Sequence, residues 1–193
     1  MVLLLAGGVG LGVAACGALT PGEEVRWRRD RESAVRHALS EQSRPAFAGL
    51  AFFPYDPSAR VRVMVEPVTP PQHLRLAASD GRVRDALRVG RVRPRLPGGQ
   101  AALAVFQLDP GSTSGDRELF LPFRDAGAGS DTYAAGRYVA VRPLPGGVVE
   151  IDFNRAYNPD CAYGIAASCP VAPDENTLPF PVRAGERLPP PAG

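Results

Sequence analysis

Two hydrophobic patterns meet near residue 44 and predict two kinds of structure. Residues 23–43 contain no Pro or Gly, and Thr20-Pro21-Gly22-Glu23 before them supplies a capping residue, a first-turn proline and a glutamate that can reach back to the cap. A modest apolar stripe follows at Val25, Trp27, Val35, Ala38 and Leu39. This stretch is predicted to be an N-terminal helix ending near Ser43.

From Phe47 onward, short apolar runs alternate with turns rich in Pro and Gly, which is typical of an antiparallel β protein. The expected strands are 60–66, 72–77, 82–89, 90–96, 101–108, 118–123, 136–141 and 148–153. About eight strands in one stretch predict a mainly β fold: a single antiparallel β-sandwich or barrel-like domain, with the helix packed on it. We expect this domain to cover 44–188 and a disordered, Pro-rich tail to follow at 189–193.

The composition is that of an ordinary globular protein. Of the 193 residues, 45% are hydrophobic and 22% are charged, which excludes a disordered, collagen-like or multi-span membrane chain. The chain has no Lys, so Arg supplies every basic side chain. One domain of this length can bury a proper hydrophobic core.

The first fifteen residues are apolar and uncharged and end at Cys16. This run is too short to span a bilayer, which takes roughly 20 residues, but it suits the central region of an export signal. The sequence Val13-Ala14-Ala15-Cys16 resembles a bacterial lipobox, although no basic residue follows Met1. We therefore expect a lipoprotein-type signal peptide at 1–15, lipidation of Cys16 with palmitate or a similar chain, and a lipid-anchored linker and helix at 16–43. Such a protein would be exported and held on a membrane of the cell envelope.

Cys161 and Cys169 form a second cysteine feature, a pair eight positions apart. In an exported protein two such thiols tend to oxidise, so a disulfide is expected. Two free thiols or a metal site are the alternatives. A tetrahedral metal site needs two more ligands, and the two histidines, His37 and His73, lie far upstream. We expect no metal and no cofactor.

Six arginines crowd residues 82–95. A nucleic-acid surface would interleave aromatic side chains for stacking, but no Phe, Trp or Tyr occurs between Asp56 and Val105. The alternate spacing of Arg91, Arg93 and Arg95 fits the outer face of a strand. We expect a solvated face, with contact to an anion or lipid headgroup as the alternative, and no nucleic-acid partner.

Residues 120–186 hold the unusual chemistry, including all three asparagines of the chain. Arginine is a bidentate donor to anions, a carboxamide both donates and accepts, and tyrosine offers a flat wall with a polar tip. The segment predicts a binding module for a small polar or anionic ligand. The candidate ligand-binding residues are Arg137, Tyr138, Asn154, Arg155, Tyr157, Asn158 and Asn176.

One string of motifs resembles a known family. DFNRAYNP at 152–159, CAY at 161–163, SCP at 168–170 and AGE at 184–186 are similar to the prokaryotic family catalogued as domain of unknown function 1684. The resemblance covers about 24–188 and implies no activity, since that family has none established, but its members often carry an export or lipoprotein signal. Gly127 and Ala128 stand where the family pattern has Thr and Ser, which counts against a hydroxyl nucleophile in that loop.

Two other functions are compatible with the same residues. Asp125, Asp152 and Glu175 are candidates for a carboxylate acid/base pair of a hydrolase or lyase, although no His follows His73 and no G-x-S-x-G motif is present. Alternatively the segment is structural or docks a partner protein, with its Asn capping turns and its Arg pairing with carboxylates. Convergence on an open cavity would favour a site, and pairing in closed networks would favour architecture.

Overall fold

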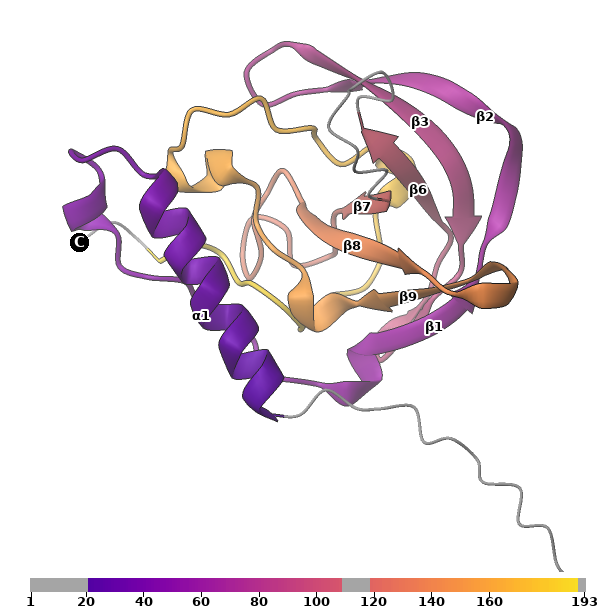
Figure 1. Cartoon of the computed structure of the whole chain (residues 1–193), viewed down its shortest axis with the longest axis horizontal. Helices are drawn as coiled ribbons and strands as arrows, with labels where there is room; N and C mark the ends of the chain where they lie inside the picture. Colours follow the sequence, from indigo (N-terminus) through magenta and orange to yellow (C-terminus); the bar gives the residue numbers. More distant parts are fainter. Residues whose placement is uncertain (1–20, 109–118, 191–193) are drawn as a thin grey trace, which may run out of the picture.

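The computed structural model describes residues 21–108 and 119–190 (Figure 1). The predicted signal peptide at 1–15, the lipidation site Cys16 and the capping Thr20 all lie outside the described residues. So do the last three residues of the predicted tail.

Helix α1 spans Pro21–Ala38, with acidic Glu23 and Glu24 in its first turn. It ends five residues before the predicted Ser43. The guanidinium of Arg44 folds back there and donates to the carbonyls of Arg36 at 3.1 Å and Leu39 at 3.0 Å, which satisfies the open end of the helix. Among the described residues, no helix is both long and apolar enough to cross a membrane.

Seven strands form one antiparallel sheet in the order β1-β9-β8-β7-β6-β3-β2. Their bounds are β1 Arg60–Met64, β2 Glu66–Ala77, β3 Val83–Val92, β6 Leu103–Leu108, β7 Leu119–Phe123, β8 Arg137–Pro143 and β9 Val148–Asp152. A small second sheet pairs β4, Arg95–Leu96, with β5, Gly99–Gln100. The predicted mainly β, antiparallel domain with an N-terminal helix is confirmed, and in the described part of the chain the large sheet keeps two edges, β1 and β2, rather than closing into a barrel.

The predicted strands at 82–89 and 90–96 are in fact largely one strand, β3, which runs through Gly90. A Cβ on Gly90 would lie 2.5 Å from the Cγ1 atom of Val65, in the bend between β1 and β2. Glycine is there because the start of the neighbouring strand β2 approaches closely, at an irregularity in the pairing of β3 with β6, and it marks no turn. The strand predicted at 72–77 begins six residues earlier, as part of β2. The other predicted strands exist with small shifts of their ends.

Within residues 21–108 and 119–190, six short 3-10 helices join these elements, and most of them lie in loops that flank the sheet. They are η1 Arg44–Ala46, η2 Pro57–Ala59, η3 Pro145–Gly147, η4 Phe153–Arg155, η5 Asp160–Tyr163 and η6 Asp174–Asn176. After β9 the described chain has no further strand of the sheet, so residues 153–190 are held by isolated bridges and side-chain contacts.

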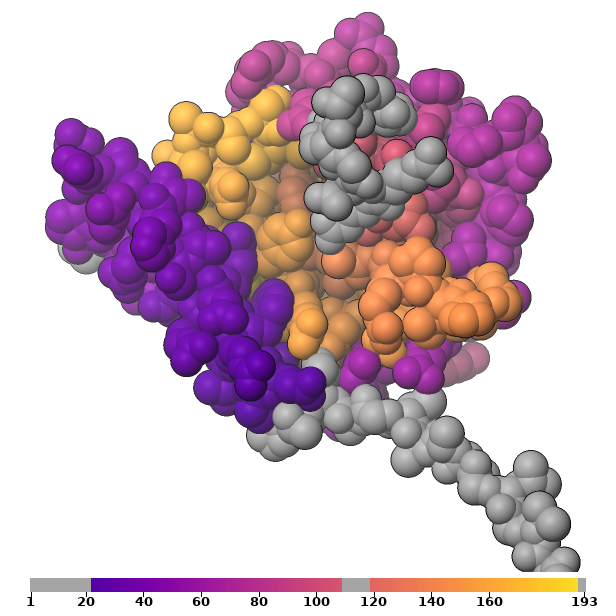
Figure 2. Space-filling view, viewed as in Figure 1, coloured from indigo at the N-terminus to yellow at the C-terminus, as the bar shows by residue number. Residues whose placement is uncertain are grey.

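The sheet buries side chains on both faces. The larger cluster lies between one face and the C-terminal segment, and it includes Val105, Leu121, Phe123, Ile151, Phe153 and Leu178. The smaller cluster on the other face joins Leu76, Ala86, Ala104, Phe106, Phe120 and Tyr138. Helix α1 lies against the segment that follows β9, as the ribbon and the space-filling view both show (Figure 1, Figure 2).

Candidate functional site

Two of the predicted ligand-binding asparagines are fully buried and bind backbone. Asn154 accepts from the amide of Asp56 and donates to its carbonyl, both at 2.8 Å. Asn176 does the same with Ala104, accepting at 2.7 Å and donating at 2.9 Å. Each carboxamide takes the place of a neighbouring peptide group and fastens a loop to a distant segment. The hydrogen-bonding groups of both side chains are therefore occupied by the protein itself.

Asn158 is buried in the same way but keeps one group unpaired. Its amide nitrogen Nδ2 donates to the carbonyl of Arg187 at 2.8 Å and to the hydroxyl of Tyr163 at 3.0 Å. Its Oδ1 atom has no hydrogen-bond partner among the described residues. The backbone amide of Asn158 donates to the carboxylate of Glu186 at 2.7 Å.

Arg137 is in a closed network and is 1% exposed. Its Nη2 donates to Oδ2 of Asp125 at 2.6 Å, and its other bonds reach the carbonyls of Val182, Ala184 and Glu186. Burial lowers the pKa of this guanidinium, and the Asp125 carboxylate opposes that shift. The Asp125 carboxylate is saturated in turn by the Gly127 amide and the Thr132 hydroxyl. The pair locks the 182–186 segment onto β8.

A second buried carboxylate, Glu186, was not among the predicted site residues. It is 0% exposed and accepts from Arg31 Nε at 2.9 Å and from the Tyr163 hydroxyl at 2.6 Å. Arg31 also donates to the carbonyl of Asn158 at 2.8 Å, and its guanidinium lies 4.9 Å from the ring centroid of Tyr157. The AGE motif is the one sequence feature that could have drawn attention to Glu186. Its ion-pair partner, Arg31, lies 155 positions upstream on α1, which the sequence does not indicate.

Two glycines are required by close packing: Gly185 of the AGE motif and Gly136 of the sequence AGRY at 135–138. Gly185 has φ +77°, and a Cβ there would lie 2.4 Å from the carbonyl oxygen of Ala156. Gly136 has φ +100°, and a Cβ there would lie 2.7 Å from the carbonyl oxygen of Phe123. Only glycine combines this backbone conformation with that approach. Both positions serve the packing of the C-terminal segment on the sheet.

The three candidate acid/base carboxylates each engage different arginines. Asp125 binds Arg137, as described above. Glu175 is hydrogen-bonded by Arg88 and Arg91 of β3. Asp152 lies at the end of β9 and caps η4 by accepting from the Asn154 amide at 3.1 Å. Tyr138, a predicted ligand-binding residue, donates its hydroxyl to the carbonyl of Pro170 and is buried.

Three of the predicted residues do meet at an open hollow of about 320 Å³, here called the Ala140 hollow. Asp152, Arg155 and Tyr157 line it, and sequence reasoning missed the rest of its wall. The complete lining is Trp27, Arg60, Val139, Ala140, Arg142, Glu150, Asp152, Arg155 and Tyr157. The hollow thus joins α1, three adjacent strands and the DFNRAYNP motif.

Ala140, a short and exposed side chain of β8, lines the hollow. The pattern along β8 is three buried residues, then exposed Ala140, then buried Val141. Ala140 pairs with Phe120 of β7, and on its other side the register of β8 and β9 continues toward Asp152. A methyl group at this position fills less of that face of the sheet than the Phe120 side chain beside it.

One rim of the hollow is a row of charges across three strands. Glu150 of β9 pairs in register with Arg62 of β1 and Arg142 of β8, which places all three side chains on one face. Its carboxylate accepts from Arg142, from Arg62 at 3.0 Å and from Arg60 at 2.9 Å. Burial alone would raise the pKa of Glu150, but these three arginines lower it to about 2. Glu150 is therefore ionised and fully engaged at neutral pH.

The opposite rim is formed by Arg155, whose side chain is 37% exposed. Its Nε atom is buried and has no hydrogen-bond partner among the described residues. The nearest carboxylate oxygen is Oδ2 of Asp152 at 3.9 Å, beyond hydrogen-bond distance, and the guanidinium carbon lies 6.0 Å from the ring centroid of Trp27. Arg155 is therefore positioned by the Asp152 carboxylate and the Trp27 ring, and its Nε–H donor stays without an acceptor among the described residues.

Cys161 and Cys169 are both free in this structure, so the predicted disulfide is not formed. The amide of Cys161 donates to Sγ of Cys169 at 3.4 Å, which makes the two residues neighbours. Burial raises the pKa of the Cys169 thiol to about 11. Among the described residues, no group of His, Cys, Asp and Glu side chains is arranged to hold a metal ion.

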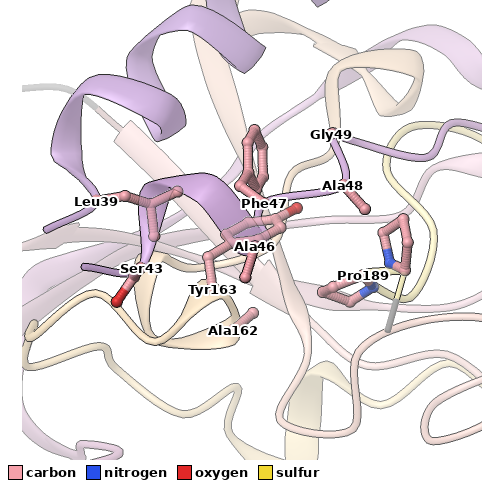
Figure 3. Close-up of a pocket in the computed structure, with 10 residues that line it drawn as sticks. Leu39, Ser43, Ala46, Phe47, Ala48, Gly49, Ala162, Tyr163 and Pro189 are labelled. Atoms are coloured by element: carbon pink, nitrogen blue, oxygen red, sulfur yellow. The ribbon is translucent and has the colours of Figure 1, made fainter. Parts of the chain in front are cut away.

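Two further depressions flank α1. One, of about 430 Å³, runs along the helix beside Arg28, Arg29 and Arg36. The other, the Phe47 groove, has a volume of about 360 Å³ and is lined mostly by apolar residues (Figure 3). In the close-up, Leu39, Ala46 and Tyr163 stand across the groove from Ala48 and Pro189. The hydroxyl of Tyr163 donates to Glu186, so it is not free to bind a ligand in this groove.

The chain was compared with known proteins. A search among curated proteins finds no match. Among solved structures, the solution NMR structure of an uncharacterized protein from Haloarcula marismortui is similar to this chain, with 33% sequence identity and a TM-score of 0.65. The similarity covers 86% of this chain and 92% of that one. The family model described as "Protein of unknown function (DUF1684)" matches residues 45–187, which include every strand and the AGE motif, and the chain therefore belongs to this family.

Proposed function

We propose that this protein is a binding module for a small polar or anionic ligand and that the ligand occupies the Ala140 hollow. The observation that carries the proposal is Arg155. Its guanidinium borders an open cavity and is partly accessible, and its Nε–H lacks an acceptor among the described residues. The unpaired Nε–H shows that the protein does not saturate this arginine, and the exposed part of the guanidinium can donate to an anionic ligand in the hollow.

Several other predicted site residues are less suited to bind a ligand than the residues that line the Ala140 hollow. The donors and acceptors of three of them, Arg137, Asn154 and Asn176, are hydrogen-bonded within the protein. These side chains therefore stabilise the fold and have few free groups for a ligand. The Ala140 hollow instead has aromatic walls in Trp27 and Tyr157 beside charged groups. A volume of roughly 300 Å³, flat apolar walls and a few polar groups are typical of small-molecule sites.

Trp27 allows a direct test, because it is the single tryptophan of the chain and lines the hollow. We expect its fluorescence to change saturably when the purified protein is titrated with organic anions of increasing size, such as propanoate, benzoate and phenyl phosphate. The Arg155→Gln variant should bind the best of these about tenfold more weakly, with a thermal midpoint within about 2 °C of the wild type, because Arg155 makes no close ion pair to lose.

Arg26→Gln is the matched control, because Arg26 is an exposed arginine on the same helix as Trp27 and does not line the hollow. This variant should bind as the wild type does. The absence of any saturable change with the whole series would contradict the proposal, as would equal binding by the wild type and Arg155→Gln. A large drop in the thermal midpoint of Arg155→Gln would assign this residue to the architecture instead.

We further propose that the protein is exported and lipid-anchored to a membrane of the cell envelope through Cys16. The support is the uncharged apolar run before Cys16 and its likeness to a lipobox. Mass spectrometry of the protein purified from its native membrane should find Cys16 at the amino terminus, carrying acyl chains. Recovery of a Cys16→Ser variant in the membrane fraction would contradict the anchor.

An oxidising envelope would also favour a disulfide between Cys161 and Cys169. Their proximity supports it, because the Cys161 amide already contacts the Cys169 sulfur. Maleimide labelling of the denatured native protein should modify neither cysteine until a reductant is added. Immediate labelling of both would overturn this proposal and leave the thiols free.

A further inference from the structure

We infer that the ligand of the Ala140 hollow carries an ammonium group beside its anionic group, as α-amino acids do. This inference rests on the proposed function, because it concerns the ligand of the same site. It starts from the second charged group next to Arg155, the carboxylate of Asp152, whose Oδ2 lies 3.9 Å from Arg155 Nε.

The two oxygens of Asp152 have different surroundings. Oδ1 accepts from the Asn154 amide at 3.1 Å and from Asn154 Nδ2 at 3.0 Å, so it caps η4. Oδ2 has no contact closer than the 3.9 Å approach to Arg155 among the interactions of the described residues. The wall of the hollow therefore holds, side by side, an arginine whose donors are not all used and a carboxylate with an underused acceptor.

A ligand with only a negative charge would fit this pair poorly. An anion bound to Arg155 would lie within a few ångströms of the Asp152 carboxylate, and like charges at such distances repel. The lining holds Arg60, Arg142 and Arg155 against Glu150 and Asp152, so both signs of charge are present. A ligand with both charges on neighbouring groups meets Arg155 with its carboxylate and Asp152 with its ammonium group.

Three probes of nearly the same shape separate these possibilities: phenylalanine, which has both groups, 3-phenylpropanoate, which has only the carboxylate, and 2-phenylethylamine, which has only the amine. Their rings suit the Trp27 and Tyr157 walls, so Trp27 fluorescence reports each titration. We expect phenylalanine to bind about tenfold more tightly than either of the other two, or better.

The Asp152→Asn variant tests the role of the carboxylate while keeping an oxygen for the η4 cap, and Asp152→Ser keeps the cap with a smaller side chain. In both, the preference for phenylalanine over 3-phenylpropanoate should fall below about threefold. In Arg155→Gln, the preference over 2-phenylethylamine should fall instead. Two opposite losses would not follow from a general loosening of the fold.

The failure of this inference is distinguishable from that of the proposed function. Binding of 3-phenylpropanoate as tight as that of phenylalanine would overturn the inference and leave a site for simple anions. The inference is also overturned if none of the three probes binds while another organic anion does. If neither the three probes nor the anion series changes Trp27 fluorescence saturably, both proposals fail.

Discussion

Arg137 makes four hydrogen bonds from a position that is 1% exposed, and three of them hold the carbonyls of one C-terminal segment. A buried cation of this kind is costly to desolvate, and it persists because Asp125 and the carbonyls compensate it. The Arg137 side chain connects the AGRY sequence with the AGE motif. They are two ends of a single contact.

The first prediction concerns that contact. Arg137→Met should reduce the free energy of unfolding by about 3–5 kcal/mol, because it leaves the Asp125 carboxylate buried without its partner. Urea denaturation at neutral pH measures this, with Arg26→Met as the exposed control. A loss in the free energy of unfolding below about 1 kcal/mol would contradict the stabilising role of the pair between Arg137 and Asp125.

Glu150 gives a prediction in pH. Its pKa lies at about 2, below the ordinary 4.5, so its ion pairs stabilise the fold fully above pH 4.5 and lose that contribution as the pH falls toward 2. Glu150→Gln should lower the free energy of unfolding at pH 7 by about 1–2 kcal/mol, a discounted figure because Arg62 and Arg142 are largely exposed.

The difference between wild type and Glu150→Gln should then shrink steadily as urea denaturation is repeated from about pH 5 down to about pH 3. Glu66→Gln is the control, since Glu66 pairs with Arg93 at an exposed position. A difference that stays constant with pH would mean that the three arginines do not hold the Glu150 carboxylate ionised.

At the scale of elements, α1 is attached to the sheet domain mainly by arginines. Among the described side chains of the helix, Glu24 and Val35 are the buried ones, while Arg28 donates to the carbonyl of Phe53 at 3.0 Å and Arg31 reaches buried Glu186. The helix also supplies Trp27 to the Ala140 hollow. Its docking therefore decides whether that site is complete.

Arg31→Met should detach the helix. The substitution leaves Glu186 buried without its cationic partner, so we expect a loss of about 2–4 kcal/mol and faster amide hydrogen exchange over residues 25–38 than in the sheet. Hydrogen-exchange mass spectrometry measures this, and Arg26→Met provides the exposed comparison. Unchanged protection of the helix would show that its apolar contacts suffice.

The helix and most strands followed from periodicity because each is encoded by its own neighbours. The start of α1 and the strands around 103–108 and 148–152 needed only local sequence. The division at Gly90 was wrong because the reason for that glycine, the close approach of Val65 before the paired strand β2, lies 25 positions away in the chain. Local patterns do not record which segment approaches a strand from outside.

At the scale of the whole molecule, the candidate site depends on contacts that one sequence does not display. The unusual DFNRAYNP motif drew attention to Asp152, Arg155 and Tyr157, which line the hollow. The same reasoning grouped them with Arg137 and Asn176, which serve the fold. Glu150, Ala140 and Trp27 were missed because strand register and helix docking bring them together.

The central claim is that the guanidinium of Arg155 binds a ligand in the Ala140 hollow. The most direct measurement follows the Nε–Hε resonance of Arg155 by NMR in isotope-labelled protein titrated with phenylalanine, with the resonance assigned by its loss in Arg155→Gln. We predict a saturable shift of this resonance and of the indole N–H of Trp27 and the amide of Ala140, with the residues of the Phe47 groove unchanged. An Arg155 resonance that stays fixed while other parts of the protein respond would contradict the claim.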